Sequence, residues 1–212
     1  MPTHTRIKIC GITRLEDALY ASQLGVDAIG FVFCAESKRA ITPVKAANIA
    51  AQLPPFMVRV GLFLNASQEE VNTACHHIPN LLPQFHGTES AEWCESFDRP
   101  YIKALGVANG MPSAQELAQY KHSQGFLFDS NAPGELGGTG HAFDWAKLEQ
   151  SAPAQLILAG GLYPDNVESA VRQVRPYAVD VSSGVEQAKG EKDALKMQTF
   201  VNAVRQADKA LA

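Results

Sequence analysis

Short apolar runs rich in β-branched and aromatic residues alternate along the chain with longer segments whose apolar residues recur at helical spacing. This alternation is typical of βα units, in which each strand is followed by a helix and the strands form a parallel sheet. Eight runs are predicted as strands, and each precedes a candidate helix. They are Arg6–Cys10, Ala28–Phe33, Met57–Leu64, Leu81–Phe85, Tyr101–Leu105, Phe126–Asp129, Gln155–Ala159 and Ala178–Ser182.

Three of the predicted helices carry sequence signals at their first turn. Thr13 with Glu16, and Ser67 with Glu70, fit the capping box, in which a hydroxyl and a carboxylate satisfy free backbone N–H groups. Thr42 is followed directly by proline, which fits an N-cap residue with proline at the first helical position. These signals support the βα alternation independently of the apolar pattern.

Eight units in 212 residues leave about 26 residues for each, which matches closely packed βα pairs. We therefore expect an α/β protein in which residues 1–212 form a single-domain (β/α)8 TIM barrel. An open doubly wound sheet is the competing architecture, but the GxGxxG turn typical of it is absent after the first strand. The glycine-rich stretch Ser130–Phe143 is predicted to be a mobile or ligand-covering loop.

The composition indicates an ordinary folded protein, with 46% hydrophobic and 19% charged residues. The formal net charge of -4 offers no general attraction for nucleic acid, so a bound anion needs a local site. The expected partner is therefore a small molecule. The absence of an evident apolar seam favours a monomer.

The cysteines are widely spaced, without a CxxC pair, so we expect reduced thiols. No signal peptide and no membrane-spanning apolar run is recognisable, which favours a cytoplasmic protein without membrane contact. The run Cys75–His77 invites a metal interpretation. Adjacent histidines on a helix point in different directions, however, so no metal site is predicted.

In a (β/α)8 barrel the active site lies where the strands end, so polar residues there are the first candidates for chemistry. They are Cys10, His86, Asp129, Asp180 and Ser182. Alone, Cys10 is readily explained as a small buried apolar residue, and Asp129 as a turn cap. Together, a thiol and a carboxyl facing one pocket supply the two groups of a proton relay.

Two glycine-containing turns follow the seventh and eighth predicted strands, at residues 159–162 (AGGL) and 182–185 (SSGV). Glycine after a strand is often only a tight turn. The loops after these two strands are, however, the place where this fold commonly binds phosphate through backbone N–H groups. The pair of turns therefore predicts a phosphate site.

The strand period of two places Lys8 on the same face as Cys10, inside the barrel. A buried ammonium needs a carboxylate partner, and Asp129 and Asp180 are the leading candidates. We further expect Lys8 to favour the thiolate form of Cys10.

The chain resembles the phosphoribosylanthranilate isomerase family, from the first strand to the final helix. The matching motifs are KICGIT at 8–13, SKR at 37–39, VGLFLN at 60–65, QFHG at 84–87, GGTG at 137–140 followed by FDW, LAGGL at 158–162 and VDVSSGVE at 179–186.

The resemblance implies that Cys10 is the general base and Asp129 the general acid. It also implies that Arg39 binds the anthranilate carboxylate, and that Asp180 and His86 contact the substrate. The implied phosphate-binding residues are Gly160, Gly161, Ser182, Ser183 and Gly184.

The implied reaction is an Amadori rearrangement that needs no cofactor. Two rivals remain. A histidine-pathway aminosugar isomerase performs the same rearrangement with paired aspartates, and Cys10 stands against it. A non-catalytic phosphometabolite-binding barrel would keep the glycine turns without needing Cys10 and Asp129.

Overall fold

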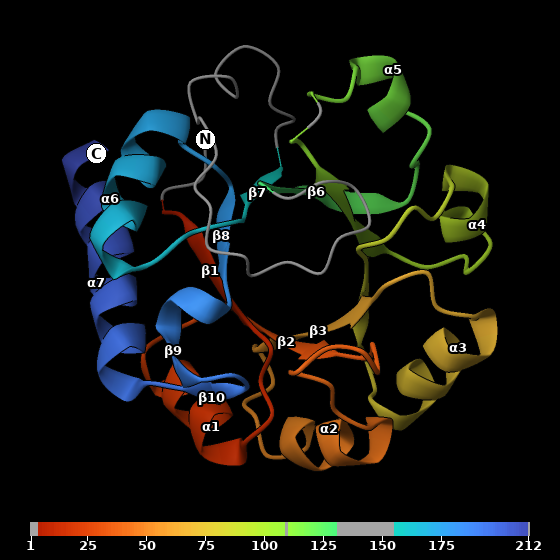
Figure 1. Cartoon of the computed structure of the whole chain (residues 1–212), viewed down its shortest axis with the longest axis horizontal. Coiled ribbons are helices and arrows are strands. Elements are labelled where there is room, and N and C mark those ends of the chain that lie inside the picture. Colours follow the sequence, from red (N-terminus) through yellow and green to blue (C-terminus); the bar gives the residue numbers. More distant parts are fainter. Residues whose placement is uncertain (1–3, 109, 131–154, 212) are drawn as a thin grey trace.

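The computed structural model describes residues 4–108, 110–130 and 155–211. Eight parallel strands form a closed barrel in the order of the chain, with the eighth strand pairing back onto the first (Figure 1). The fold predicted from the sequence is confirmed. The strands are β1 (Arg6–Cys10), β2 (Ala28–Val32), β3 (Val58–Phe63), β4 (Leu82–Phe85), β5 (Tyr101–Gly106), β6 (Ser123–Asp129), β7 (Leu156–Leu158) and β8 (Ala178–Val181).

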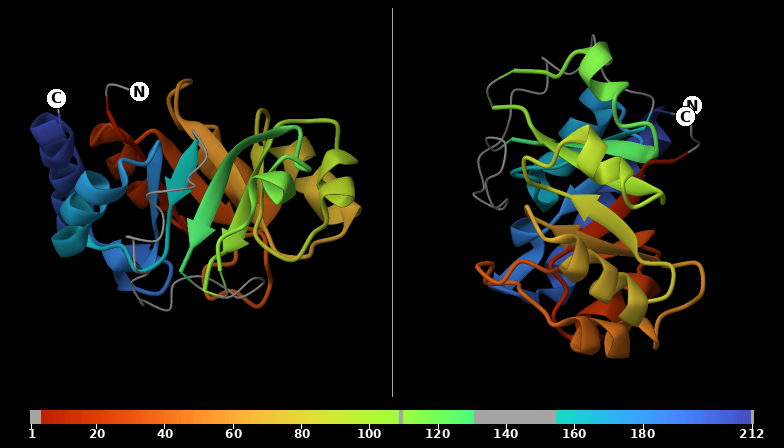
Figure 2. Two further views of the ribbon diagram at one scale, coloured as in Figure 1. Left: turned by 90° about the horizontal axis from the view of Figure 1, so that it is seen from above. Right: turned by 90° about the vertical axis from the view of Figure 1, so that its right-hand side faces the viewer.

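The helices surround this barrel, and the strand arrows point to one side of the molecule in the left view of Figure 2. They are α1 (Leu15–Gln23), α2 (Pro43–Ala50), α3 (Gln68–His77), α4 (Ala91–Glu95), α5 (Ala114–Leu117), α6 (Pro164–Val174) and α7 (Ala194–Leu211). The helix predicted after β6, and the predicted loop beyond Ser130, lie outside the described residues.

Alternation along β1 determines what the barrel encloses. Ile7 and Ile9 belong to the apolar core shared with the helices, whereas Lys8 and Cys10 occupy the alternate positions. Lys8 is only 4% exposed, and it lies directly opposite Asp180 in the register of β1 and β8. The predicted inward orientation of Lys8 is thus confirmed, and it occurs at the pair of strands that closes the barrel.

The apolar core includes an outer and a central cluster. A large apolar cluster lies between strands and helices, and it includes Phe31, Phe63 and Phe200. A smaller cluster comes from five of the strands or their ends, and it combines Val60, Ile102, Ala104, Leu127, Ile157, Ala159 and Ala178. Side chains therefore fill the barrel centre, as is usual for this fold.

The first-turn signals have different outcomes. The Ser67 and Glu70 capping box is present, and the Thr42 hydroxyl accepts a hydrogen bond from the Lys45 N–H at 3.3 Å. The capping box predicted for Thr13 is wrong, because α1 has Arg14 at its N-cap without a side-chain bond. The Thr13 hydroxyl instead donates to the Gly190 carbonyl, a tertiary contact that outweighs the local one.

The segment after β8 contains elements that the sequence pattern does not predict. A short 3₁₀ helix, η2 (Ser183–Val185), leads into the two-stranded antiparallel hairpin of β9 (Glu186–Ala188) and β10 (Glu191–Lys192). The hairpin lies beside α1 (Figure 1). Within the described ranges, no helix is long and apolar enough to cross a membrane.

Candidate active site

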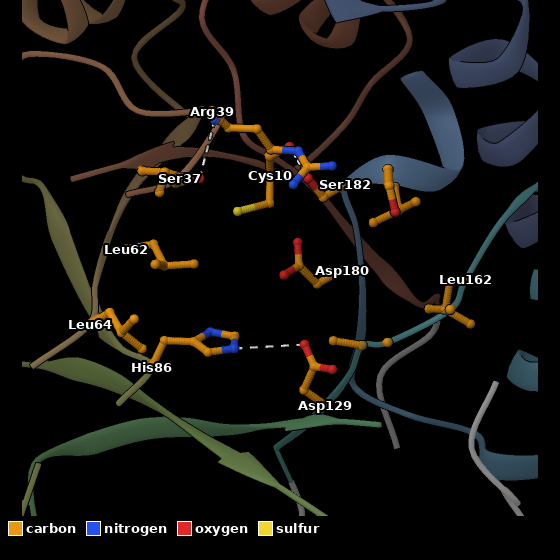
Figure 3. A pocket seen from close by; sticks show the side chains of 16 residues that line it. Cys10, Ser37, Arg39, Leu62, Leu64, His86, Asp129, Leu162, Asp180 and Ser182 are labelled. Carbon is orange, nitrogen blue, oxygen red and sulfur yellow. Dashed lines mark hydrogen bonds and ion pairs between the residues drawn. The ribbon is translucent and has the colours of Figure 1, made fainter. Parts of the chain in front are cut away.

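A pocket opens at the carboxyl ends of the strands, where the fold places active sites (Figure 3). The structure brings together nearly all the candidates predicted from the sequence, and Gly184 alone among them is not part of the lining. The predicted residues that line the pocket are Cys10, Arg39, His86, Asp129, Gly160, Gly161, Asp180, Ser182 and Ser183. Apolar walls come from Val32, Leu62, Leu64 and Leu162.

Cys10 and Asp129 lie on opposite sides of this pocket, with Asp180 between them (Figure 3). Cys10 is opposite Gly30 in the register of β1 and β2, and a Cβ at Gly30 would lie only 2.7 Å from the Cys10 sulfur. Any larger residue there would displace the thiol. Gly30 is therefore part of the site, although the sequence analysis did not single it out.

A buried ion pair lies beneath the thiol. Lys8 Nζ is 2.9 Å from Asp180 Oδ2, and both side chains are almost fully enclosed. Burial lowers the pKa of Lys8, but the Asp180 carboxylate and Cys10 outweigh this effect and hold the Lys8 pKa above its ordinary value. Burial is the largest influence on the Cys10 thiol and holds its pKa above the ordinary value, although Lys8 and Lys192 act to lower it. Lys8 therefore stays charged and offsets part of the cost that burial places on forming the thiolate.

Asp180 uses only one of its oxygens in this ion pair. Its Oδ1 atom is buried and has no hydrogen-bond partner among the described residues. Because a buried carboxylate oxygen without a partner is costly, this atom is a natural acceptor for a hydroxyl group of a bound molecule.

His86 is held neutral on the side of the pocket near Asp129. Burial, together with the cations Lys8 and Lys103, lowers the pKa of His86 to about 3. Its Nδ1 atom is hydrogen-bonded to the Gln84 side chain at 3.1 Å, and its Nε2 atom lies 3.7 Å from Asp129 Oδ2. A neutral imidazole adds no cation beside the Asp129 carboxyl.

The backbone around His86 is fixed by a second buried ion pair. Lys103 Nζ donates to the carbonyl groups of Phe85, at 3.2 Å, and of Gly87, at 2.8 Å, and lies 2.9 Å from Glu89 Oε2. Both side chains of this pair are no more than 2% exposed. The pair therefore fixes the chain on both sides of His86 and, with it, the direction of the imidazole.

The two glycine turns meet at one wall of the pocket. Gly160 and Gly161 have φ angles of 83° and 63°, a conformation that other residues rarely adopt. A Cβ at Gly184 would lie 1.9 Å from the Leu162 carbonyl oxygen, so the second turn packs on the first. The Asn166 amide donates to the Gly161 carbonyl at 2.8 Å and holds the first turn from α6. Gly184 thus supports the pocket wall through its close approach to Leu162, without lining the pocket itself.

Arg39 reaches the pocket from the segment between β2 and α2, and its guanidinium pairs with Glu186 at the start of β9. The sequence analysis quoted Glu186 within a motif but gave it no role. Lys192, which also contacts Glu186, was missed. The pair of Arg39 and Glu186 has no local signal, because it joins residues 147 positions apart. Gln84 could have been found from the strand period, since it lies two residues before His86.

All four cysteines are free thiols. Within the described parts of the chain, no group of three or more histidine, cysteine, aspartate or glutamate side chains is arranged to hold a metal ion.

The barrel and its pocket define an enzyme of the (β/α)8 class, with a thiol and a carboxyl facing one cavity beside two glycine turns. The sequence model of the family described as N-(5'-phosphoribosyl)anthranilate (PRA) isomerase matches residues 7–203. The chain belongs to this family.

Curated relatives and solved structures agree with this assignment. The N-(5'-phosphoribosyl)anthranilate isomerase of Stutzerimonas stutzeri is 52% identical over 200 residues, covering 94% of this chain and 97% of the relative. That of Pseudomonas fluorescens is 54% identical, covering 94% and 98%. The crystal structure of the phosphoribosylanthranilate isomerase from Thermotoga maritima is 40% identical, with a TM-score of 0.83 and coverage of 95% and 99%.

A further solved structure carries a ligand. It is a phosphoribosylanthranilate isomerase in complex with reduced 1-(o-carboxyphenylamino)-1-deoxyribulose 5-phosphate. This structure is 38% identical to the chain, has a TM-score of 0.79 and covers 95% of this chain and 99% of its own.

The depressed pKa of His86 predicts a specific loss of stability in acid. The fold lowers the pKa of His86 to about 3 and so keeps it neutral above that pH, whereas a histidine in the unfolded chain has its ordinary pKa of 6.5. Between these two pKa values the unfolded state binds more protons than the folded state. The free energy of unfolding should therefore fall by about 2 kcal/mol because of His86 as the pH is lowered from about 7 to about 5.

His86→Asn should remove that part of the pH dependence. Urea unfolding of the wild type and the variant at both pH values measures it, with His76→Asn, at an exposed position of α3, as the matched control. Equal pH dependence in the wild type and His86→Asn would contradict the neutral, buried histidine.

Proposed function

We propose that the chain catalyses the Amadori rearrangement of N-(5-phosphoribosyl)anthranilate to 1-(2-carboxyphenylamino)-1-deoxyribulose 5-phosphate, a step of tryptophan biosynthesis. One observation carries the proposal: Cys10 and Asp129 line a single pocket together with Arg39 and the two glycine turns. Sequence identity of 52% to a curated isomerase over most of the chain supports it.

The substrate has a charged group at each end, and the pocket has a complementary feature for each. The phosphate would lie against Gly160 and Gly161 and the turn Ser182–Gly184, where glycine lets backbone N–H groups approach the oxygens. The anthranilate carboxylate would pair with Arg39, whose planar guanidinium suits a carboxylate. The sugar would then span the pocket centre, near Asp180 Oδ1.

Asp129 acts first, as the general acid. It donates a proton to the furanose ring oxygen, and the bond between that oxygen and C1 breaks as the nitrogen lone pair forms a protonated imine. His86 lies beside this carboxyl as a neutral group, and its place in the pocket lets it contact the substrate.

Cys10 acts second, as the general base. Its thiolate removes the proton from C2, and the electrons of that C–H bond flow into the protonated imine to form an enolamine. The enolamine then gains a proton at C1 and loses the proton of its C2 hydroxyl, which gives the ketone. The protonated imine is itself the electron sink, so no cofactor is required.

We also propose that residues 1–212 form one catalytic domain, working as a monomer in the cytoplasm. The pairing of β1 with β8 joins the two ends of the chain in one barrel, which supports a single domain. At the amino-terminal end of the barrel, Phe56 is 95% exposed and Val58 is 42% exposed, so this face carries apolar surface that the sequence pattern did not reveal.

Removal of either catalytic group should abolish most turnover and leave the fold intact. Cys10→Ala and Asp129→Asn each delete one partner of the relay at the carboxyl ends of β1 and β6, and losses of about 100-fold or more in kcat are expected. Product formation by the purified variants, with circular dichroism to check folding, measures the effect. Near-wild-type turnover in either folded variant would refute the acid and base assignment.

Inorganic phosphate or sulfate should compete with the substrate for the glycine turns. The anion would occupy the wall formed by residues 160–161 and 182–184, because these turns offer backbone donors side by side. Inhibition kinetics and a sulfate-soaked crystal measure this. An anion bound elsewhere, with these turns empty, would count against the phosphate site.

Loss of the cation beside Cys10 should move the pH profile of turnover. Lys8 lies close enough to lower the pKa of the thiol, so Lys8→Met should raise the pH at which kcat reaches half its plateau. The variant also leaves Asp180 without its ion-pair partner, so its folding must be verified. An unchanged profile in a folded Lys8→Met variant would exclude the proposed coupling.

A further inference from the structure

The guanidinium of Arg39 is held along one edge by a carboxylate of the protein itself. Arg39 Nε lies 2.7 Å from Glu186 Oε1, and Nη2 lies 2.8 Å from Oε2. The side chains are 12% and 6% exposed, so this two-bond pair is shielded from water. Such pairing fixes the plane of a guanidinium as well as its position.

The stem of Arg39 is confined as well. A Cβ at Gly11 would lie 2.5 Å from Arg39 Cδ and 3.1 Å from Ser182 Oγ. Gly11 itself has a φ angle of 76°, which favours glycine. The glycine directly after Cys10 therefore provides the space through which the arginine passes the thiol.

Glu186 is in turn fixed by β10. Lys192 Nζ lies 2.9 Å from Glu186 Oε1, with its side chain fully buried, and the Gly190 N–H donates to the same oxygen at 3.3 Å. Burial raises the pKa of Glu186, but the hydrogen bonds from Arg39 and the charge of Lys192 outweigh it and hold this pKa below its ordinary value. The carboxylate is thus ionised and satisfied by groups of the protein.

Lys192 also reaches the second glycine turn. Its Nζ atom donates to the Ser182 carbonyl at 3.1 Å, so one ammonium joins Glu186 to the turn proposed to bind phosphate. The backbone of Lys192 is held by two residues at the start of α1. The Lys192 N–H donates to Asp17 Oδ2 at 3.0 Å, and the Lys192 carbonyl accepts from Nη2 of Arg14, the N-cap residue, at 3.1 Å. The hairpin is therefore attached to the segment that follows Cys10.

The charges of this cluster leave it attractive to an anion. Arg39 and Lys192 are two cations around a single carboxylate, so one positive charge remains uncompensated within the group. Glu186 occupies the Nε and Nη2 edge of the guanidinium. The opposite edge, which carries Nη1, makes no hydrogen bond within the described residues, and Arg39 lines the pocket.

Building on the proposed function, we propose that Glu186 is a positioning residue for substrate recognition. It turns the second edge of Arg39 toward the carboxylate of the substrate, while Lys192 fixes Glu186 relative to the phosphate turn. A series of three contacts, from Arg39 to Glu186, on to Lys192 and from there to Ser182, thereby sets the distance between the carboxylate and phosphate subsites. Glu186 never touches the substrate, yet it determines how strongly an aryl carboxylate is preferred.

Binding of two ligands that differ only in the carboxyl group tests this role. The first is reduced 1-(o-carboxyphenylamino)-1-deoxyribulose 5-phosphate, and the second is its counterpart with an unsubstituted phenyl ring. Glu186→Gln should raise the dissociation constant of the carboxylated ligand about tenfold, because a neutral amide no longer holds the guanidinium at both nitrogens. The carboxyl-free ligand should change by less than about twofold, since it makes no bond to Arg39.

Matched variants separate positioning from a structural defect. Glu191→Gln makes the same change in the same hairpin, at a half-exposed residue that does not contact Arg39, and should leave both dissociation constants unchanged. In an Arg39→Met background, Glu186→Gln should have no further effect on either ligand. If Glu186→Gln does not fold, Glu186→Asp serves instead, because its shorter carboxylate would pull the guanidinium back.

Equal weakening of both ligands, or no weakening of the carboxylated one, would overturn the positioning role. If the variant shows either result while the wild type still converts phosphoribosylanthranilate, the inference fails and the proposed function remains supported. A wild type that binds both ligands equally would also overturn the inference, because Arg39 would then not bind the carboxylate.

Discussion

The buried ion pair of Lys8 and Asp180 is the interaction on which the arrangement of the site depends. The two residues are direct register partners on β1 and β8, the strands that close the barrel. A register slip of one residue would turn Lys8 outward and leave Asp180 as an uncompensated charge in the barrel. The ion pair therefore favours one closure, and that closure places Cys10 two residues further along β1, at the mouth of the pocket.

Each residue of this ion pair also has a second role at the pocket. One oxygen of Asp180 satisfies Lys8, and the other remains available at the pocket. Lys8 neutralises Asp180 and, at the same time, is the cation that most lowers the pKa of the Cys10 thiol. On the far side of the pocket, His86 is kept neutral by burial and by two lysines. The pocket thus places a cation near the base and an uncharged group near the acid.

Much of this architecture could be predicted from the sequence, because local patterns encode it. The bounds of β1 agree with the prediction, and Ser67 caps its helix, because both depend on residues that are neighbours in the chain. Thr13 failed as a cap because its hydroxyl bonds to Gly190, far away in sequence. The β9 and β10 hairpin escaped prediction because its strands are too short to show an alternating pattern.

The residues of the candidate site were likewise predicted where the signal is local and missed where it depends on tertiary contacts. Cys10, Asp129 and the glycine turns were found because each follows a strand, which is a position that the fold itself marks as functional. The partner of Lys8 was narrowed to two aspartates and no further, since only the register of β1 against β8 selects Asp180. Glu186 pairs with Arg39, 147 positions away, and Lys192 is held by Asp17, 175 positions away, and a single sequence holds no signal for such pairs.

The central claim is that this pocket converts phosphoribosylanthranilate rather than merely binding a phosphorylated molecule. A single-turnover experiment with excess wild-type protein, followed by the loss of anthranilate fluorescence, tests it most directly. The account predicts an exponential loss whose rate rises with protein concentration and saturates once the substrate is fully bound. Loss at the spontaneous rate, at concentrations where sulfate binding shows the pocket to be intact, would contradict it.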